Sequence, residues 1–297
     1  MSVRRMGAWR GEGGFGGGGY VGGYGDGRGH VQSVLGAGQV AGSRHRVYMR
    51  NASSMSELDG VPVHLVVTAP PYWNPKTHGN DYDGYLSGIG TVLAESVRVL
   101  HQGRFAVINV ANTSAGSGTK PVNCDVIRMM EGMGLEFKRE IIWVKPRGTQ
   151  GLWQQGTTKF LKREPWPCHP SLNIQHEYIL IFQKPGDPGI EMSDATRLPE
   201  AFIRRYAWSV WEMRVSRTRG HPAPFPDELP RRIIRLFTNQ GESVLDPFGG
   251  SGTTAAVCME LGRDSHTYEI NPEYMQLIRS NLTRLDPSRS SFSIASY

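Results

Sequence analysis

Nine consecutive residues, Asp246–Thr254, combine three glycines with small hydroxyl side chains and lie between a predicted strand and a predicted helix. Glycines at such a point let the backbone turn tightly and approach a ligand, and the start of the helix offers free amide donors. No lysine follows, so the turn is not a phosphate-binding P-loop. Glu269 comes about 15 residues later, at the end of the next predicted strand, where a carboxylate can hold ribose hydroxyls. The pattern predicts a site for a ribose-bearing ligand. The alternative is a tight strand–helix connection with Glu269 as a surface charge.

A second candidate site is the segment Thr68–Trp73, Thr-Ala-Pro-Pro-Tyr-Trp, which follows the apolar run 63–67. Two adjacent prolines hold the backbone extended and remove two amide donors, while their carbonyls stay free as acceptors. The aromatic pair Tyr72 and Trp73 can offer a ring face to a base. A strand-ending loop with core aromatics would have the same composition. The glycine turn in the same chain favours the functional interpretation.

Strands alternate with helices around these two segments. The hydrophobic pattern predicts strands over 63–67, 105–110, 137–144, 178–182, 243–245 and 266–270, and helices over 85–100, 122–133, 227–239, 253–261 and 274–285. Such alternation is typical of a mainly parallel sheet with helices on both faces. Two stretches, 146–175 and 185–220, lack periodicity and are rich in proline, arginine and lysine.

Composition narrows the class of protein. The 297 residues carry a net charge of +6, which suggests a polyanionic partner without proving one. No apolar run reaches the roughly 18–20 residues of a membrane span, and no apolar segment typical of a secretory signal follows the N-terminus. The three cysteines are scattered, so we expect neither disulfides nor a metal site, and a reducing cytoplasm is the simplest setting.

The first 40 residues differ from the rest of the chain. Twelve glycines fall within residues 11–29, and such a stretch loses much backbone entropy on ordering while burying almost nothing. We therefore expect residues 1–40 to be a disordered tail and 41–297 to be the folded domain. Aromatic residues and arginines in the tail are similar to nucleic-acid-binding tails, although a plain flexible leader has the same composition.

The glycine turn, Asp-Pro-Phe-x-Gly-x-Gly-Thr-Thr, resembles the S-adenosylmethionine loop of the DNA amino-methyltransferases, which make N4-methylcytosine or N6-methyladenine. The resemblance runs from about residue 45 to about residue 283. It implies that the cofactor is held by Asp246, Pro247, Phe248, Gly249, Gly250, Ser251, Gly252, Thr253 and Thr254, by Glu269 and Ile270, and by Pro224 and Phe225 of a His-Pro-Ala-Pro-Phe-Pro segment.

The order of the motifs resembles the permuted β group of this family, because the Pro-Pro-Tyr segment precedes the glycine turn by about 175 residues. Residues 141–146 and 176–180 also resemble segments of that group. The resemblance implies an α/β, Rossmann-like methyltransferase fold with a mostly parallel seven-stranded sheet. Stretches 146–175 and 185–220 would form the inserted target-recognition region, whose arginines and lysines suit phosphates and guanine edges.

The same resemblance places the catalytic site at Thr68, Ala69, Pro70, Pro71, Tyr72 and Trp73. It implies that the Pro70 carbonyl accepts a hydrogen from the target amino group and that Tyr72 stacks on a flipped-out base. Position 69 departs from the family, which has Ser or Asp there. Ala69 has no side-chain acceptor for the target amino group, and losing one such charge-stabilising hydrogen bond can cost about 10²–10³ in rate. Three explanations stay open: a weakened natural enzyme, a catalytically dead binder and an engineered substitution.

The target base follows from the residues around the two prolines. Thr68-x-Pro-Pro-Tyr-Trp resembles the cytosine-N4 form more than the adenine form. We therefore expect a site-specific cytosine-N4 DNA methyltransferase. An adenine-N6 methyltransferase and a DNA-binding protein with impaired turnover are the alternatives. The expected partner is double-stranded DNA, with a second copy of the chain and a cognate restriction endonuclease as further candidates, in the cytoplasm of a prokaryotic cell or viral host.

Overall fold

The computed structural model describes residues 42–79, 81–115, 118–146, 174–190, 197–216, 226–283, 285 and 290–296. The predicted tail, nearly all of stretch 146–175, and Cys168, Pro224 and Phe225 lie outside these ranges. The expectations placed on them therefore stay predictions.

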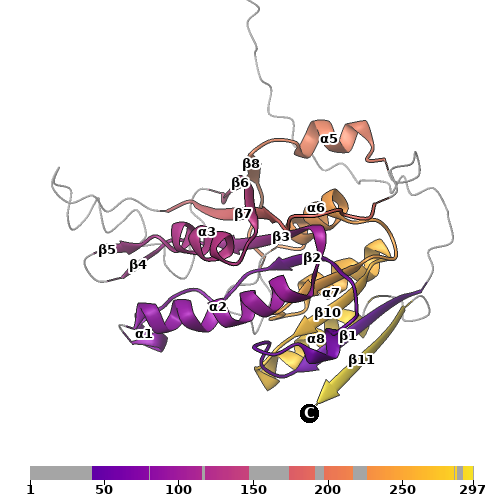
Figure 1. Ribbon diagram of the computed structural model, residues 1–297, viewed down its shortest axis with the longest axis horizontal. Helices are drawn as coiled ribbons and strands as arrows, with labels where there is room; N and C mark the ends of the chain where they lie inside the picture. Colours follow the sequence, from indigo (N-terminus) through magenta and orange to yellow (C-terminus); the bar gives the residue numbers. More distant parts are fainter. Residues whose placement is uncertain are drawn as a thin grey trace, which may run out of the picture. The chain divides into compact units, whose positions relative to one another are not determined.

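A single large sheet forms the middle of the folded unit (Figure 1). Its strand order is β11-β1-β10-β9-β2-β3-β7-β6-β8. The first six of these strands run parallel to one another, and β7 runs antiparallel to both neighbours. The strands are Ser43–Met49 (β1), Val63–Thr68 (β2), Leu100–Val110 (β3), Glu136–Val144 (β6), His176–Gln183 (β7), Val210–Glu212 (β8), Ser243–Asp246 (β9), Asp264–Tyr268 (β10) and Ser290–Ser296 (β11). The mostly parallel sheet is confirmed, but the described residues form nine strands of it, so the expected seven is wrong.

The strands of this sheet that were not predicted from the sequence are β1, β8 and β11. β1 alternates exposed arginines with buried polar residues. The buried residues satisfy each other, because His45 bonds Ser43 Oγ through Nε2 and Ser265 Oγ through Nδ1, both at 2.8 Å. β8 has three residues and pairs with β6. Together with the helix Glu200–Tyr206 (α5) it lies within the stretch 185–220, so the expectation of irregular structure there is wrong for these residues.

Helices cover both faces of the sheet, as expected. Tyr82–Val99 (α2) and Val122–Gly132 (α3) pack on one face, and Glu228–Phe237 (α6), Thr253–Leu261 (α7) and Pro272–Thr283 (α8) on the other. The alternation along β2 explains both contacts, since Val66 faces the α2 side and its neighbours Leu65 and Val67 face α6. The shorter elements are Ser56–Leu58 (η1), Pro75–His78 (α1) and the hairpin Thr113–Ala115 (β4) with Gly118–Lys120 (β5).

The parallel arrangement places the carboxyl ends of six strands at one edge of the sheet. β1, β2, β9 and β10 all end there, and this carboxyl edge is where open α/β sheets bind ligands. The Pro-Pro-Tyr segment follows β2, and the glycine turn follows β9. The fold therefore brings together two motifs that are far apart in the sequence.

None of the helices in the described ranges is long and apolar enough to cross a membrane.

Candidate active site

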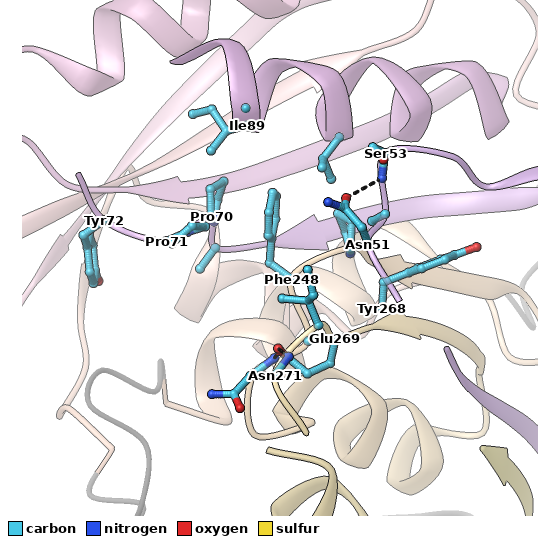
Figure 2. Close-up of a pocket in the computed structure, with 18 of the residues that line it drawn as sticks. Asn51, Ser53, Pro70, Pro71, Tyr72, Ile89, Phe248, Tyr268, Glu269 and Asn271 are labelled. Carbon is cyan, nitrogen blue, oxygen red and sulfur yellow. Dashed lines mark hydrogen bonds between the residues drawn. The ribbon is translucent and has the colours of Figure 1, made fainter. Parts of the chain in front are cut away.

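A cavity of about 900 Å³ opens at the carboxyl edge of the sheet (Figure 2). This volume lies near the upper end of the roughly 300–1,000 Å³ typical of small-molecule sites. The loops after β1, β2, β9 and β10 and one side of α2 form its walls. Both predicted sites contribute to this cavity, through Ala69, Pro70, Pro71 and Tyr72 on one side and Pro247, Phe248, Gly249, Gly250, Ser251, Thr253, Glu269 and Ile270 on the other.

Asp246 joins the two halves of the site without lining the cavity. Its side chain is buried and accepts hydrogen bonds from the hydroxyls of Thr68, at 2.7 Å, and Thr254, at 2.6 Å. The Phe248 amide donates to it as well, at 3.2 Å. Burial raises the pKa of Asp246 to about 6, although these three donors oppose the shift. Thr68, Asp246, Gly252 and Thr254 do not line the cavity, so the structure gives them a supporting position.

The turn after β9 needs its glycines. A Cβ on Gly249 would lie 2.2 Å from Cγ2 of Thr267, and the Gly249 amide donates to the Tyr268 carbonyl at 2.8 Å. Gly252, at the start of α7, has φ of 77°, in the left-handed region. The turn therefore lies tightly against the end of β10, with its backbone facing the cavity.

Glu269 fixes the other side of the turn. One carboxylate oxygen accepts from the Gly250 amide and the other from the Asn271 amide, both at 2.7 Å. Burial raises the pKa of Glu269, while these amides act in the opposite direction. Each oxygen keeps a lone pair for a further donor, such as a ligand hydroxyl. Ile270 beside it is 66% exposed and lines the cavity, so it offers an apolar surface to a flat ring.

The Pro-Pro-Tyr segment forms the opposite wall. Figure 2 shows Pro70 and Pro71 between Tyr72 and Phe248, which projects into the middle of the cavity. The Pro71 carbonyl accepts a hydrogen bond of 3.0 Å from the Tyr85 hydroxyl on α2. This bond occupies the Pro71 carbonyl, whereas no hydrogen bond from the described residues reaches the Pro70 carbonyl.

Trp73 does not belong to the cavity. Its side chain is 3% exposed and packs edge-on against the ring of Tyr82, with 5.4 Å between the centroids. Lys120 of β5 lies over both rings. Of the two aromatic residues that follow the prolines, only Tyr72 borders the cavity, and Trp73 is a core residue.

Part of the site lies outside the two motifs. The loop Arg50–Ser53 lines the cavity, and its turn is held by a 2.9 Å bond from the Ser53 amide to Asn51 Oδ1. Tyr85 and Ile89 of α2 complete the wall. The loop could not be placed because β1, which precedes it, has no apolar pattern. The α2 residues fall within the predicted helix 85–100, where no motif indicates a ligand site.

The sequence profile of the N6/N4 methyltransferases, described as DNA methylase, matches residues 63–280, from the start of β2 into α8. The chain belongs to this DNA methylase family. Both cavity-lining motifs lie within the match.

Individual relatives agree with this family. The chain is 28% identical over 290 residues to the type II methyltransferase M.MjaI of Methanocaldococcus jannaschii, covering 81% of this chain and 91% of the relative. It is 30% identical over 282 residues to the type II methyltransferase M.MthZI of Methanothermobacter thermautotrophicus, covering 80% and 76%.

Solved methylase structures share the fold. The DNA modification methylase TTHA0409 of Thermus thermophilus, solved in complex with S-adenosyl-L-methionine, superposes with a TM-score of 0.69 at 29% identity, over 85% of this chain and 98% of that one. The cytosine-N4-specific PvuII DNA methyltransferase superposes with a TM-score of 0.62 at 20% identity, over 85% and 96%. At that identity the second likeness concerns the fold alone.

Proposed function

We propose that this DNA methylase transfers a methyl group to the exocyclic N4 of a cytosine flipped out of double-stranded DNA. The observation that carries the proposal is the single cavity in which the Pro-Pro-Tyr wall faces the glycine turn and Glu269. A DNA base cannot be reached inside the duplex, so it must leave the stack to enter such a cavity.

S-adenosylmethionine is the cofactor, as it is in the complex of the relative TTHA0409. When bound, it supplies a methyl group on a sulfonium sulfur. The residues present fit this molecule: the Glu269 carboxylate suits ribose hydroxyls, and the exposed Ile270 side chain suits the adenine ring. Gly249 and Gly250 line the cavity beside them, where the methionine part would lie.

The residues around Pro70 act on the base. An exocyclic amino nitrogen is a poor nucleophile because its lone pair is delocalised into the ring. An acceptor aimed at one of its hydrogens localises that lone pair and stabilises the positive charge that develops on the nitrogen. That charge develops as the nitrogen–methyl bond forms and the methyl–sulfur bond of the sulfonium breaks, and the amino group would then lose one proton to water. The Pro70 carbonyl is that acceptor, and Tyr72 supplies the ring face against which the base stacks. Ala69 leaves the second amino hydrogen without a side-chain acceptor, so we expect slow turnover.

Cytosine is favoured by Thr68-x-Pro-Pro-Tyr-Trp, which resembles the cytosine-N4 form. Arginines and lysines in stretches 146–175 and 185–220 are proposed to contact the DNA. Because the relatives are type II methyltransferases, we propose that the chain acts beside a cognate restriction endonuclease in a prokaryotic cytoplasm.

The test uses cofactor with an isotopically labelled methyl group and DNA of mixed sequence. After incubation the DNA is digested to nucleosides, and mass spectrometry identifies which of them carries the label. Labelled N4-methylcytosine supports the proposal. Labelled N6-methyladenine would overturn the assignment of the base, and unlabelled DNA from both the parent chain and Ala69→Ser would overturn the proposed function.

A further inference from the structure

A buried carboxylate lies directly behind the Pro-Pro-Tyr wall. Glu177, on β7, is 2% exposed and accepts hydrogen bonds on both oxygens. The Tyr72 hydroxyl donates to Oε1 at 2.8 Å, and the Asn109 amide of β3 donates to Oε2 at 2.6 Å. The ammonium group of Lys145, which follows β6, forms an ion pair with Oε1. Four separate segments of the chain therefore meet at this one side chain.

The cluster holds Glu177 in one place. Both members of the ion pair are largely buried, with side-chain exposures of 3% for Glu177 and 14% for Lys145. Lys145 also lies 5.1 Å from the centroid of the Trp143 ring. A buried ion pair adds little stability over apolar residues of similar volume. Stability alone therefore gives a weak reason for a carboxylate here.

Tyr72 is the only partner of Glu177 in this cluster that also lines the cavity. The prolines fix the backbone before it, but they leave the torsions of its own side chain free. The bond to Glu177 removes that freedom by fixing the far end of the ring. Burial first, and then the neighbouring Glu177 carboxylate, raise the pKa of Tyr72. Its hydroxyl therefore stays protonated and continues to donate.

We propose that Glu177, held by Lys145 and Asn109, is a positioning residue that fixes the Tyr72 ring as the wall against which the flipped base stacks. This inference rests on the proposed function. It assigns a role to residues of the segments 141–146 and 176–180, which resemble segments of the β group but had no role implied by that resemblance. Glu177 touches neither base nor cofactor and acts through Tyr72.

A double-mutant cycle tests this coupling. Tyr72→Phe keeps the ring and removes its bond to Glu177, and we expect kcat/KM for DNA to fall about 10-fold or more. Glu177→Ala should cause at least the same loss, and the double variant should lose little more than Glu177→Ala alone. Cofactor affinity, measured without DNA, should stay within about twofold in Tyr72→Phe because the cofactor half is untouched.

Glu177→Gln is the rescue variant, since it keeps an oxygen for Tyr72 while Asn109 can turn its amide to accept from the new NH₂ group. We expect it to retain more activity than Glu177→Ala, which leaves Lys145 buried without its partner. Tyr178→Phe is the matched control, because it removes a neighbouring hydroxyl, bonded to His176 at 3.0 Å, that does not line the cavity. Thermal unfolding of every variant separates loss of positioning from loss of fold.

Two results would overturn the inference. Losses from Tyr72→Phe and Glu177→Ala that multiply independently would show that Glu177 does not act through Tyr72. A loss of cofactor affinity or of melting temperature in Glu177→Gln as large as that in Glu177→Ala would show that the cluster serves the fold alone. Failure of the proposed function is a different outcome, in which neither the parent chain nor Ala69→Ser methylates DNA.

Discussion

The hydroxyl of Thr68 donates a 2.7 Å hydrogen bond to the carboxylate of Asp246, 178 residues further along the chain. Thr68 ends β2 immediately before the Pro-Pro-Tyr wall, and Asp246 ends β9 immediately before the glycine turn. One buried contact therefore fixes the base side of the cavity relative to the cofactor side.

Removing this contact should weaken the fold and the site together. Thr68→Val keeps the shape and deletes one of two hydroxyl donors to a buried carboxylate. We expect the free energy of unfolding to fall by about 1–3 kcal/mol, with weaker cofactor binding, since Asp246 also orients the turn. Urea unfolding at pH 8 measures the first effect. The exposed Thr283 provides the control, Thr283→Val, and equal stability of the two variants would contradict the account.

Glu269→Gln should weaken cofactor binding. An amide at this position cannot accept from Gly250 and Asn271 at once, because one of its two ends is now a donor. A loss of about 1–3 kcal/mol raises the dissociation constant by roughly 5–150-fold. Calorimetric titration without DNA measures it, with Glu273→Gln on the exposed start of α8 as the control. An unchanged dissociation constant would remove Glu269 from the cofactor site.

Acid should destabilise the fold through His45. Burial lowers the pKa of His45 to about 4, whereas an unfolded histidine takes up its proton near pH 6.5. Between these values only the unfolded state binds the proton, so stability decreases as pH falls. The cost between pH 7 and pH 5 is about 2 kcal/mol. Denaturant unfolding at both values should show this additional loss in the parent chain and not in His45→Gln; the same loss in both would contradict the assignment.

Residues 1–40 should be dispensable for folding and cofactor binding, because glycine dominates them. A chain that starts at residue 41 should retain its unfolding midpoint and its cofactor dissociation constant. Weaker DNA binding alone would indicate an accessory role of the tail. Failure to fold, or loss of cofactor affinity, would contradict the prediction.

Much of the site was predictable because its motifs lie at strand ends. The hydrophobic pattern gave the bounds of α7, Thr253–Leu261, as the structure has them, and placed a turn and an acidic residue where the carboxyl edge forms. The polar strand β1 was missed because its buried polar residues are paired in the fold: His45 bonds Ser43 directly and also bonds Ser265 on β10, a strand more than 200 residues away.

The surroundings of the two aromatic residues could not be predicted from the sequence either. Tyr72 and Trp73 are adjacent, yet only Tyr72 borders the cavity, whereas Trp73 is buried against Tyr82 of α2. The bond from Tyr72 to Glu177 spans 105 residues and depends on the position of β7 beside β3, which no local pattern encodes.

The rate of N4-methylcytosine formation by the parent chain and by Ala69→Ser tests the central claim most directly. Serine adds a hydroxyl next to Pro70, where charge develops as the amino group is methylated. We predict that Ala69→Ser forms labelled N4-methylcytosine about 10²-fold faster, with nearly unchanged cofactor affinity, and that adding Tyr72→Ala removes much of this gain. Equal rates in the parent chain and Ala69→Ser would contradict the acceptor role assigned to this position.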